Sequence, residues 1–304
     1  MTTESVGGSP PRLSFIGAGR AGSTLAAAAR AAGWDVVAIA SSRRQSAGRL
    51  ADAVGAAVAR TPGEAARAAD LTFVTVPDPH IAAVAARIAA SGMGLRGRGV
   101  VHCSASLGPE PLAAVRQAGA RTGVAHPLQA LCGAGSVPLL QGAYFRIEAG
   151  LELRPVLEHF VVAVGGKPLT VATASRALYH AAAVLAGNAP LALLARATHL
   201  LEEAGIDAAT ANAALSRLLE GAAANAGLAG PQRALTGPVA RGDAATVQAH
   251  LDALATEPGI LDLYLRLAEE TLALAGIAGR EDVKAVLDRA ELITRRGFGS
   301  SRVA

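Results

Sequence analysis

Lysine, cysteine and aromatic residues are scarce in this 304-residue sequence. Only two of its 28 basic residues are lysines, Lys167 and Lys284. Five Phe, three Tyr and one Trp leave few rings on which nucleic-acid bases could stack, and the arginines are scattered, so we expect no nucleic-acid partner. The two cysteines, Cys103 and Cys132, exclude a disulfide framework and suit a reducing, cytoplasmic compartment.

Signal-peptide and membrane signatures are also missing from the sequence, although its mean hydropathy is +0.35. The most apolar stretch, residues 181–195, is interrupted by Asn188 and Pro190 and is shorter than the roughly 20 residues of a membrane span. The first residues have neither the basic nor the apolar region of a signal peptide. We therefore expect a cytoplasmic protein without a membrane partner. Its net charge of +4 suits an anionic cofactor and a small anionic substrate.

A glycine-rich turn follows the first apolar run, residues 12–16, and leads into an alanine-rich stretch typical of a helix. In such a G-x-G-x-x-G pattern, the first glycine makes a tight turn and the second lets the backbone approach a pyrophosphate. The third allows close packing of helix and strand. The N–H groups and dipole at the helix N-terminus attract the anion. The residues predicted to form this dinucleotide site are Gly17, Gly19, Arg20, Ala21 and Gly22.

The end of the second predicted strand, residues 35–40, indicates which dinucleotide binds. An NAD site usually places an acidic side chain there for the ribose 2′-OH, whereas an NADP site offers small polar and arginine side chains to the 2′-phosphate. Here the next residues are Ser41, Ser42 and Arg43, and no acid occurs before Asp52. Because a guanidinium matches phosphate geometry, we predict NADP as the cofactor. The alternative is an exposed basic turn without a ligand.

The hydrophobic pattern divides the chain into two parts. Apolar β-rich runs alternate with helical segments up to residue 172, which indicates a parallel sheet with crossover helices. We predict a disordered tail at 1–11, an α/β Rossmann-like dinucleotide-binding domain at 12–172 and an all-α substrate and dimerisation domain at 173–304. The predicted strands are residues 12–16, 35–40, 71–76, 99–103, 121–125, 143–148 and 167–171.

Long helical segments fill the second part, where strand patterns vanish. Asp207 and Asp243 stand where helix N-caps are expected. The predicted helices are residues 174–204, 207–228, 243–256, 258–276 and 281–294.

Polar residues follow three of the predicted strands, on the edge where the cofactor would bind. Val76, Pro77 and Asp78 stand at the end of the third strand, where the proline ends the ladder. They are predicted to line the nicotinamide–ribose pocket, or else form a plain turn. Ser104, after the fourth strand, could bind the nicotinamide or a substrate oxygen, or belong only to a turn. His126, at the tip of the fifth strand, is either catalytic or structural.

The first long helix carries two polar residues on one apolar stripe. His180 and Asn188 are eight residues apart and so share a helix face. Pro190 crowds the carbonyl of Ala186, so we expect a kink near Asn188. Buried polar side chains need partners. We therefore predict catalytic roles for both residues, and the alternative is that they satisfy one another.

One arginine of the second part is a candidate substrate anchor. Arg241 lies in the connection 235–243 and could hold a substrate carboxylate through a bidentate pair, or be a surface arginine beside Asp243. We predict no metal site.

Residues 12–275 resemble a Rossmann-like family that is paired with a helical domain of unknown function. The family is similar to ketopantoate reductases, pyrroline-5-carboxylate reductases and the 6-phosphogluconate dehydrogenase group. This resemblance implies an NADP-dependent oxidoreductase, a 6-phosphogluconate dehydrogenase C-terminal-like second domain and a homodimer. The matching segments are the glycine pattern, Thr75–Asp78, His126–Gln129, Tyr179–Asn188 and Leu235–Asp243.

One departure from the related enzymes concerns the proton donor. Ordinary ketopantoate and 6-phosphogluconate enzymes use a lysine on the first helix of the second domain, and this sequence has none there. His180 is the available acid. We therefore expect NADPH-dependent reduction of a small carboxylate-bearing carbonyl compound, with ketopantoate (2-dehydropantoate) of pantothenate biosynthesis as the first candidate. The alternatives are a cyclic imine, a prephenate-like substrate, for which the aromatic residues are few, or a redox-sensing protein that binds NADPH without turnover.

Overall fold

The computed structural model describes residues 11–92 and 94–300 of the chain. The predicted disordered tail therefore lies, apart from Pro11, outside the described residues. The chain forms two compact units, Met1–Ala189 and Pro190–Ala304, and each is considered by itself.

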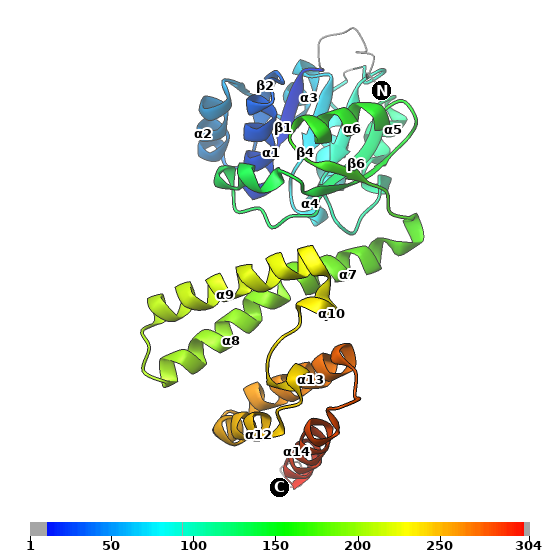
Figure 1. The fold of residues 1–304 in the computed structure, drawn as a ribbon. Coiled ribbons are helices and arrows are strands. Elements are labelled where there is room, and N and C mark those ends of the chain that lie inside the picture. The colour runs from blue at the N-terminus through cyan, green and yellow to red at the C-terminus, as the bar shows by residue number, and fades with distance from the viewer. Residues whose placement is uncertain (1–10, 93, 301–304) are drawn as a thin grey trace. The chain divides into compact units, whose positions relative to one another are not determined.

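An eight-stranded sheet with the order β3-β2-β1-β4-β5-β6-β7-β8 forms the centre of the first unit (Figure 1). Helices cover both of its faces, which confirms the predicted Rossmann-like fold. The strands are β1 (Leu13–Ile16), β2 (Val36–Ala40), β3 (Ala57–Val58), β4 (Leu71–Val74), β5 (Gly99–His102), β6 (Arg121–Pro127), β7 (Tyr144–Ala149) and β8 (Lys167–Leu169). The helices between them are α1 (Arg20–Ala31), α2 (Arg44–Val54), α3 (Pro62–Ala68), α4 (Asp78–Ala89), α5 (Ala113–Gln117) and α6 (Arg154–Ala163).

The strand pairing corrects the expectation of a wholly parallel sheet. All seven predicted strands are present, and the short edge strand β3 is an addition. Strand β7 runs antiparallel to β6, while the other neighbours pair in parallel. The connection from β6 to β7 contains only a 3-10 segment, η2 (Ala134–Leu140), and lacks the α-helix that usually joins two parallel strands.

Two apolar cores lie on the two faces of the sheet. In β1, Phe15 points into one core and Ile16 into the other, as the alternation of side chains in a strand requires. The scarce aromatic residues gather in the first core, where Phe73 stacks on Phe15 at 5.0 Å between ring centroids and meets Phe160 at 4.7 Å. Such pairs add stability beyond the area that they bury.

The rest of the described chain is helical, as predicted. The helix is interrupted where the sequence predicted a kink, because α7 ends at Gly187 and α8 begins at Ala189, with Asn188 between them. The carboxylate of Asp207 caps α9 through the N–H groups of Ala209 and Thr210, and that of Asp243 caps α12. The helices are α7 (Arg176–Gly187), α8 (Ala189–Glu203), α9 (Ala208–Ala229), α10 (Pro231–Ala234), α11 (Pro238–Arg241), α12 (Ala244–Ala253), α13 (Pro258–Ala275) and α14 (Glu281–Ser300).

The stretch Thr173–Glu203, which contains α7 and α8, is strongly apolar and exposed. By length and composition it could cross a membrane, with a mean hydropathy of 1.4 and none of its most apolar window buried. The expectation that this region is too short for a span is thereby corrected. Helices that a second protein surface covers in an assembly would be equally exposed in the single chain.

Candidate functional site

The glycine-rich turn between β1 and α1 has the geometry that its sequence predicts. Gly17 has a φ of +117°, and a Cβ there would lie 2.6 Å from the carbonyl oxygen of Thr75. A Cβ on Gly22 would lie 2.0 Å from the carbonyl oxygen of Gly17, so only glycine lets α1 pack against the turn. Gly19 is the N-cap of α1, makes no side-chain cap and faces open space. The first N–H groups of α1 therefore lack helical partners and stay available to an anion.

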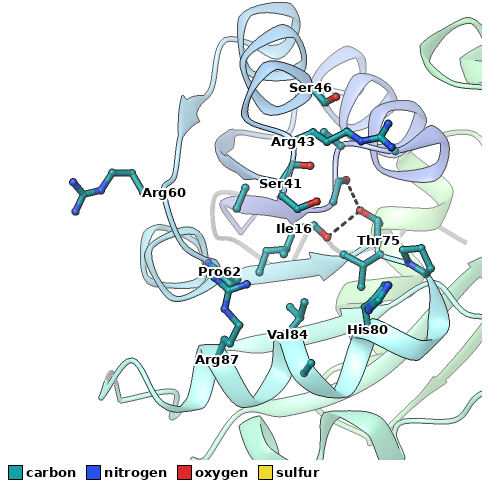
Figure 2. Close-up of a pocket in the computed structure, with 18 residues that line it drawn as sticks. Ile16, Ser41, Arg43, Ser46, Arg60, Pro62, Thr75, His80, Val84 and Arg87 are labelled. Atoms are coloured by element: carbon teal, nitrogen blue, oxygen red, sulfur yellow. Dashed lines mark hydrogen bonds between the residues drawn. The ribbon is translucent and has the colours of Figure 1, made fainter.

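Thr75 ties this turn to the end of β4. Its hydroxyl donates to the carbonyl oxygen of Gly17 at 2.7 Å (Figure 2). Its backbone N–H donates to the carbonyl oxygen of Ile16 at 2.9 Å. The turn is thus fixed to the neighbouring strand rather than to its own strand alone.

A cavity of about 810 Å³ opens from the glycine-rich turn, a size typical of cofactor sites (Figure 2). Ser41 and Arg43 line one side of it, and His80, Val84 and Arg87 of α4 line the opposite side. The predicted residues that line the cavity are Gly17, Gly19, Ser41, Ser42, Arg43, Val76 and Pro77. The other predicted cofactor residues, Arg20, Ala21, Gly22 and Asp78, do not line it.

The positive charge of the cavity lining suits an anionic ligand that carries phosphate groups. Three arginines, Arg43, Arg60 and Arg87, contribute to the lining, and no Asp or Glu does. Arg60 and Arg87 were not predicted from the sequence. Arg60 follows β3, a strand that the sequence did not reveal. Arg87 lies seven residues after His80 on α4, and this helical spacing was the available signal.

A group of polar side chains adjoins this cavity at the carboxyl ends of β4 and β5. Asp78, the residue after Pro77 of the cavity wall, accepts hydrogen bonds from the hydroxyls of Ser104 at 2.6 Å and Ser106 at 3.2 Å. His102, at the end of β5, is buried; its Nε2 donates to the carbonyl oxygen of Gly108 at 2.7 Å, which leaves Nδ1 to accept from the backbone N–H of Ser104. Burial lowers the pKa of His102, so this ring is neutral at pH 7.

His126 on β6 lies in the same region and contacts α7. Its Nδ1 lies 2.8 Å from the hydroxyl oxygen of Tyr179, with the two rings nearly perpendicular. Burial and the nearby positive charges of Arg146 and His180 lower the pKa of His126 to about 4. Burial raises the pKa of Tyr179 to about 12. Both side chains are therefore neutral at pH 7. Sequence reasoning did not select Tyr179, although it directly precedes His180.

A buried arginine supports this arrangement from β7. The side chain of Arg146 is fully buried; it ion-pairs with Glu148 at 2.9 Å and donates to the carbonyl oxygens of Ser104 and Leu107. Its guanidinium lies 5.8 Å from the centre of the Tyr179 ring. Arg176, at the start of α7, bonds Glu148 as well. The buried charge of Arg146 needs such partners. Because Glu148 also binds Arg176, the same carboxylate attaches the start of α7 to β7.

The structure brings three of the five predicted catalytic residues into one region. Ser104, His126 and His180 lie near one another in the first unit, and His180 is exposed. Asn188 is exposed at the end of α7, and within the described chain no hydrogen bond joins it to His180. Arg241 is exposed in the second unit at the end of α11, where its charge helps to lower the pKa of the capping Asp243.

The described residues include neither a reactive thiolate at Cys103 nor a group of potential metal ligands. Burial raises the pKa of Cys103 to about 12, so its thiol stays protonated. Within residues 11–92 and 94–300, no three His, Cys, Asp or Glu side chains are grouped as metal ligands.

Comparisons with known proteins agree with this geometry. Residues 12–106 match the family model described as NADP oxidoreductase coenzyme F420-dependent, and residues 143–271 match a domain of unknown function (DUF2520). No curated protein matches the chain.

Three solved structures share the fold. A Bacteroides fragilis protein named for NADP oxidoreductase activity is 24% identical, with a TM-score of 0.72 over 86% of this chain and 98% of that one. Plasmodium falciparum pyrroline carboxylate reductase with NADP bound is 13% identical, with a TM-score of 0.57 over 95% and 100%. Aspergillus terreus reductive aminase in complex with NADPH and ethyl-5-oxohexanoate is 19% identical, with a TM-score of 0.55 over 96% and 95%. The chain thus combines a Rossmann-like domain similar to NADP oxidoreductases with a helical domain that matches the domain of unknown function.

Proposed function

We propose that the protein uses NADPH to reduce the C=O or C=N bond of a small carboxylate-bearing compound. The observation that carries this proposal is the continuity of the segment Thr75–Asp78. Val76 and Pro77 line the cofactor cavity, and the next residue, Asp78, is bonded to Ser104 in the adjoining polar group. A dinucleotide whose pyrophosphate lies on the glycine-rich turn would therefore have its nicotinamide near these polar side chains.

The cavity fits NADP. The space in front of Gly19 is open and the N-terminus of α1 faces it, which suits the pyrophosphate. Arg43 with Ser41 and Ser42 would hold the 2′-phosphate. When bound, NADPH supplies the hydride, while the chain orients the substrate and stabilises the charge that develops on it.

The side chains near the nicotinamide suit reduction of a polar double bond. His126 is neutral at pH 7 and can donate a hydrogen bond to the reacting oxygen or nitrogen, and Ser104 offers a hydroxyl. His180 on α7 is then the candidate proton donor. Asn188, at the end of the same helix, is proposed to contact the substrate oxygen or a neighbouring hydroxyl. Ketopantoate is one candidate substrate. Cyclic imines are a second, favoured by the fold shared with a pyrroline carboxylate reductase and a reductive aminase.

A screen of NADPH oxidation over 2-oxo acids, including ketopantoate, and over cyclic imines tests the proposal. We expect turnover of at least one member of the panel, measured as the loss of NADPH absorbance. Gly19→Val is the matched control, because its side chain would occupy the pyrophosphate space without meeting protein atoms at its Cβ. Activity that persists in Gly19→Val comes from a contaminating reductase. Tight NADPH binding without turnover across the panel would favour the redox-sensing alternative.

We propose further that the protein is a cytoplasmic homodimer that associates through α8 and α9. No residue of α8 and only Ala211 of α9 is buried, and large apolar side chains are exposed on both helices. Leu191 is 57% exposed, Leu218 68% and Leu228 87%. A soluble protein seldom leaves such a patch uncovered.

Light scattering on the purified protein is expected to give twice the chain mass of 30.3 kDa. Replacing Leu218 and Leu228 together with glutamate should yield the monomer, because charged side chains are disfavoured in an apolar interface. Purification that requires detergent would instead indicate that the exposed stretch Thr173–Glu203 contacts a membrane.

A further inference from the structure

The two ring nitrogens of His126 have different surroundings. Nδ1 lies 2.8 Å from the hydroxyl oxygen of Tyr179. Nε2 has no hydrogen-bond partner within the described part of the chain, yet it is absent from the fully buried unpartnered atoms found there. Nε2 is therefore not fully buried, and it is the ring nitrogen that no protein group occupies among the described residues.

We propose that Tyr179 is a positioning residue that fixes the tautomer of His126, so that His126 presents Nε2–H as a hydrogen-bond donor to the reacting oxygen or nitrogen. The inference rests on the proposed reduction for its catalytic meaning, although the tautomer itself is a property of the protein alone.

The chemistry of the two groups decides the direction of the hydrogen bond between them. A phenol is a better donor than acceptor, and an unprotonated imidazole nitrogen is a good acceptor. Tyr179 keeps its proton at neutral pH, since burial raises its pKa to about 12. The phenol O–H therefore donates to Nδ1. The single proton of the neutral imidazole must then be on Nε2.

The charges around His126 keep the ring neutral. Burial contributes most to lowering the pKa of His126, Arg146 of β7 and His180 of α7 lower it further, and only Asp78 at the start of α4 raises it. Arg146 also lies 5.8 Å from the centre of the Tyr179 ring, where its charge makes the phenol a stronger donor. The same guanidinium thus opposes protonation of the histidine and strengthens the bond that orients it.

The position of Tyr179 is set by ion pairs that hold the start of its helix. Arg176, one turn earlier on α7, bonds Glu148, which in turn pairs with Arg146. This chain of ion pairs fixes the first turns of α7 against β7, and β7 pairs directly with β6 at the register of His126 and Arg146. The phenol oxygen is therefore held at the height of the His126 ring.

The arrangement separates two roles during reduction. As the hydride reaches the substrate carbon, negative charge develops on the substrate oxygen or nitrogen, and Nε2–H of His126 stabilises it without giving up its proton. The proton that completes the reaction comes from another group, for which His180 is the candidate. A neutral donor is suited to this task because it forms the hydrogen bond at every pH above its pKa of about 4.

Nitrogen-15 NMR of the imidazole rings tests the tautomer directly in the full-length protein. At pH 7 we expect Nε2 of His126 to be protonated and Nδ1 to be bare, with the signal assigned by its disappearance in His126→Gln. In Tyr179→Phe the ring should become a mixture of both tautomers. A His126 signal with the proton on Nδ1 in the unmodified protein, or an unchanged signal in Tyr179→Phe, overturns the proposal.

The second unit offers a matched control. His250 and Tyr264 form the same kind of pair, with Nδ1 and the hydroxyl oxygen 2.9 Å apart and the rings at 88°. Tyr264→Phe removes a hydroxyl in the same geometry but outside the proposed site. It should leave the His126 signal and turnover unchanged.

Kinetics then separate positioning from structure. With a substrate from the reductase screen, Tyr179→Phe should lower kcat/KM about 3- to 10-fold, the value of one hydrogen bond, and leave the Kd for NADPH unchanged. His126→Gln, which keeps a neutral N–H donor, should retain more activity than His126→Ala. Equal activities of these two variants would overturn the donor role. If no substrate is turned over, the proposed function fails while the NMR result still decides the tautomer.

Discussion

Replacing His180 with alanine is expected to lower kcat by about 10²- to 10⁴-fold, the usual size of a general-acid effect. His180 is exposed on α7 beside Tyr179 and lies near His126, in the region proposed to face the substrate. The sequence has no lysine on this helix to replace it as the proton donor. NADPH binding should stay nearly unchanged, because the cavity lining does not include His180.

Single-turnover and steady-state kinetics measure this effect, and two variants delimit it. Asn188→Ala should mainly reduce kcat/KM, as expected for a lost transition-state contact. His199→Ala is the matched control, since this histidine on α8 pairs only weakly with Glu257 at 3.8 Å. Normal turnover by a His180→Ala protein that melts at a lower temperature would show that the residue is structural.

Replacing Arg43 with alanine is expected to weaken NADPH binding by about 1.5–3 kcal/mol, the value of a hydrogen bond to a charged group. This corresponds to about a 10- to 150-fold increase in Kd. The Kd for NADH should change little, because NADH has no 2′-phosphate for the guanidinium to bind. Isothermal titration calorimetry with both cofactors measures the difference.

Arg44 provides the control for this experiment. It is the first residue of α2, follows Arg43 directly and does not line the cavity. Arg44→Ala should therefore leave both Kd values nearly unchanged, although it also removes one arginine charge, at the position next to Arg43. An equal loss of affinity for NADPH and NADH in Arg43→Ala would contradict the assignment of the 2′-phosphate.

The cofactor cavity was largely predictable because most of its residues are close together in sequence. Residues 12–43 contain the first strand, the glycine-rich turn, the helix start and the basic turn, and each of these is a local pattern. Arg60 and Arg87 were missed because the end of β3 and the helix α4 reach the cavity only in the tertiary structure.

The polar group beside the cavity was predictable only in part. Ser104 and His126 could be selected because polar residues at the carboxyl ends of strands face the cofactor edge. Arg146 could not, since it lies within a strand and its burial depends on the carbonyl oxygens of Ser104 and Leu107. Tyr179 likewise could not be selected, because its role depends on a contact with the ring of His126, which lies 53 positions earlier in the sequence.

By itself, the sequence determined the order of seven of the eight strands, the helix caps at Asp207 and Asp243, the break at Asn188 and the dinucleotide turn. These features depend on backbone preferences and hydrogen bonds between residues a few positions apart. Only the tertiary structure decided the antiparallel direction of β7, the burial of Arg146 and the bond between Tyr179 and His126. Each of these depends on segments far apart in the chain, which the pairing of β6 with β7 and the ion pairs of α7 bring together.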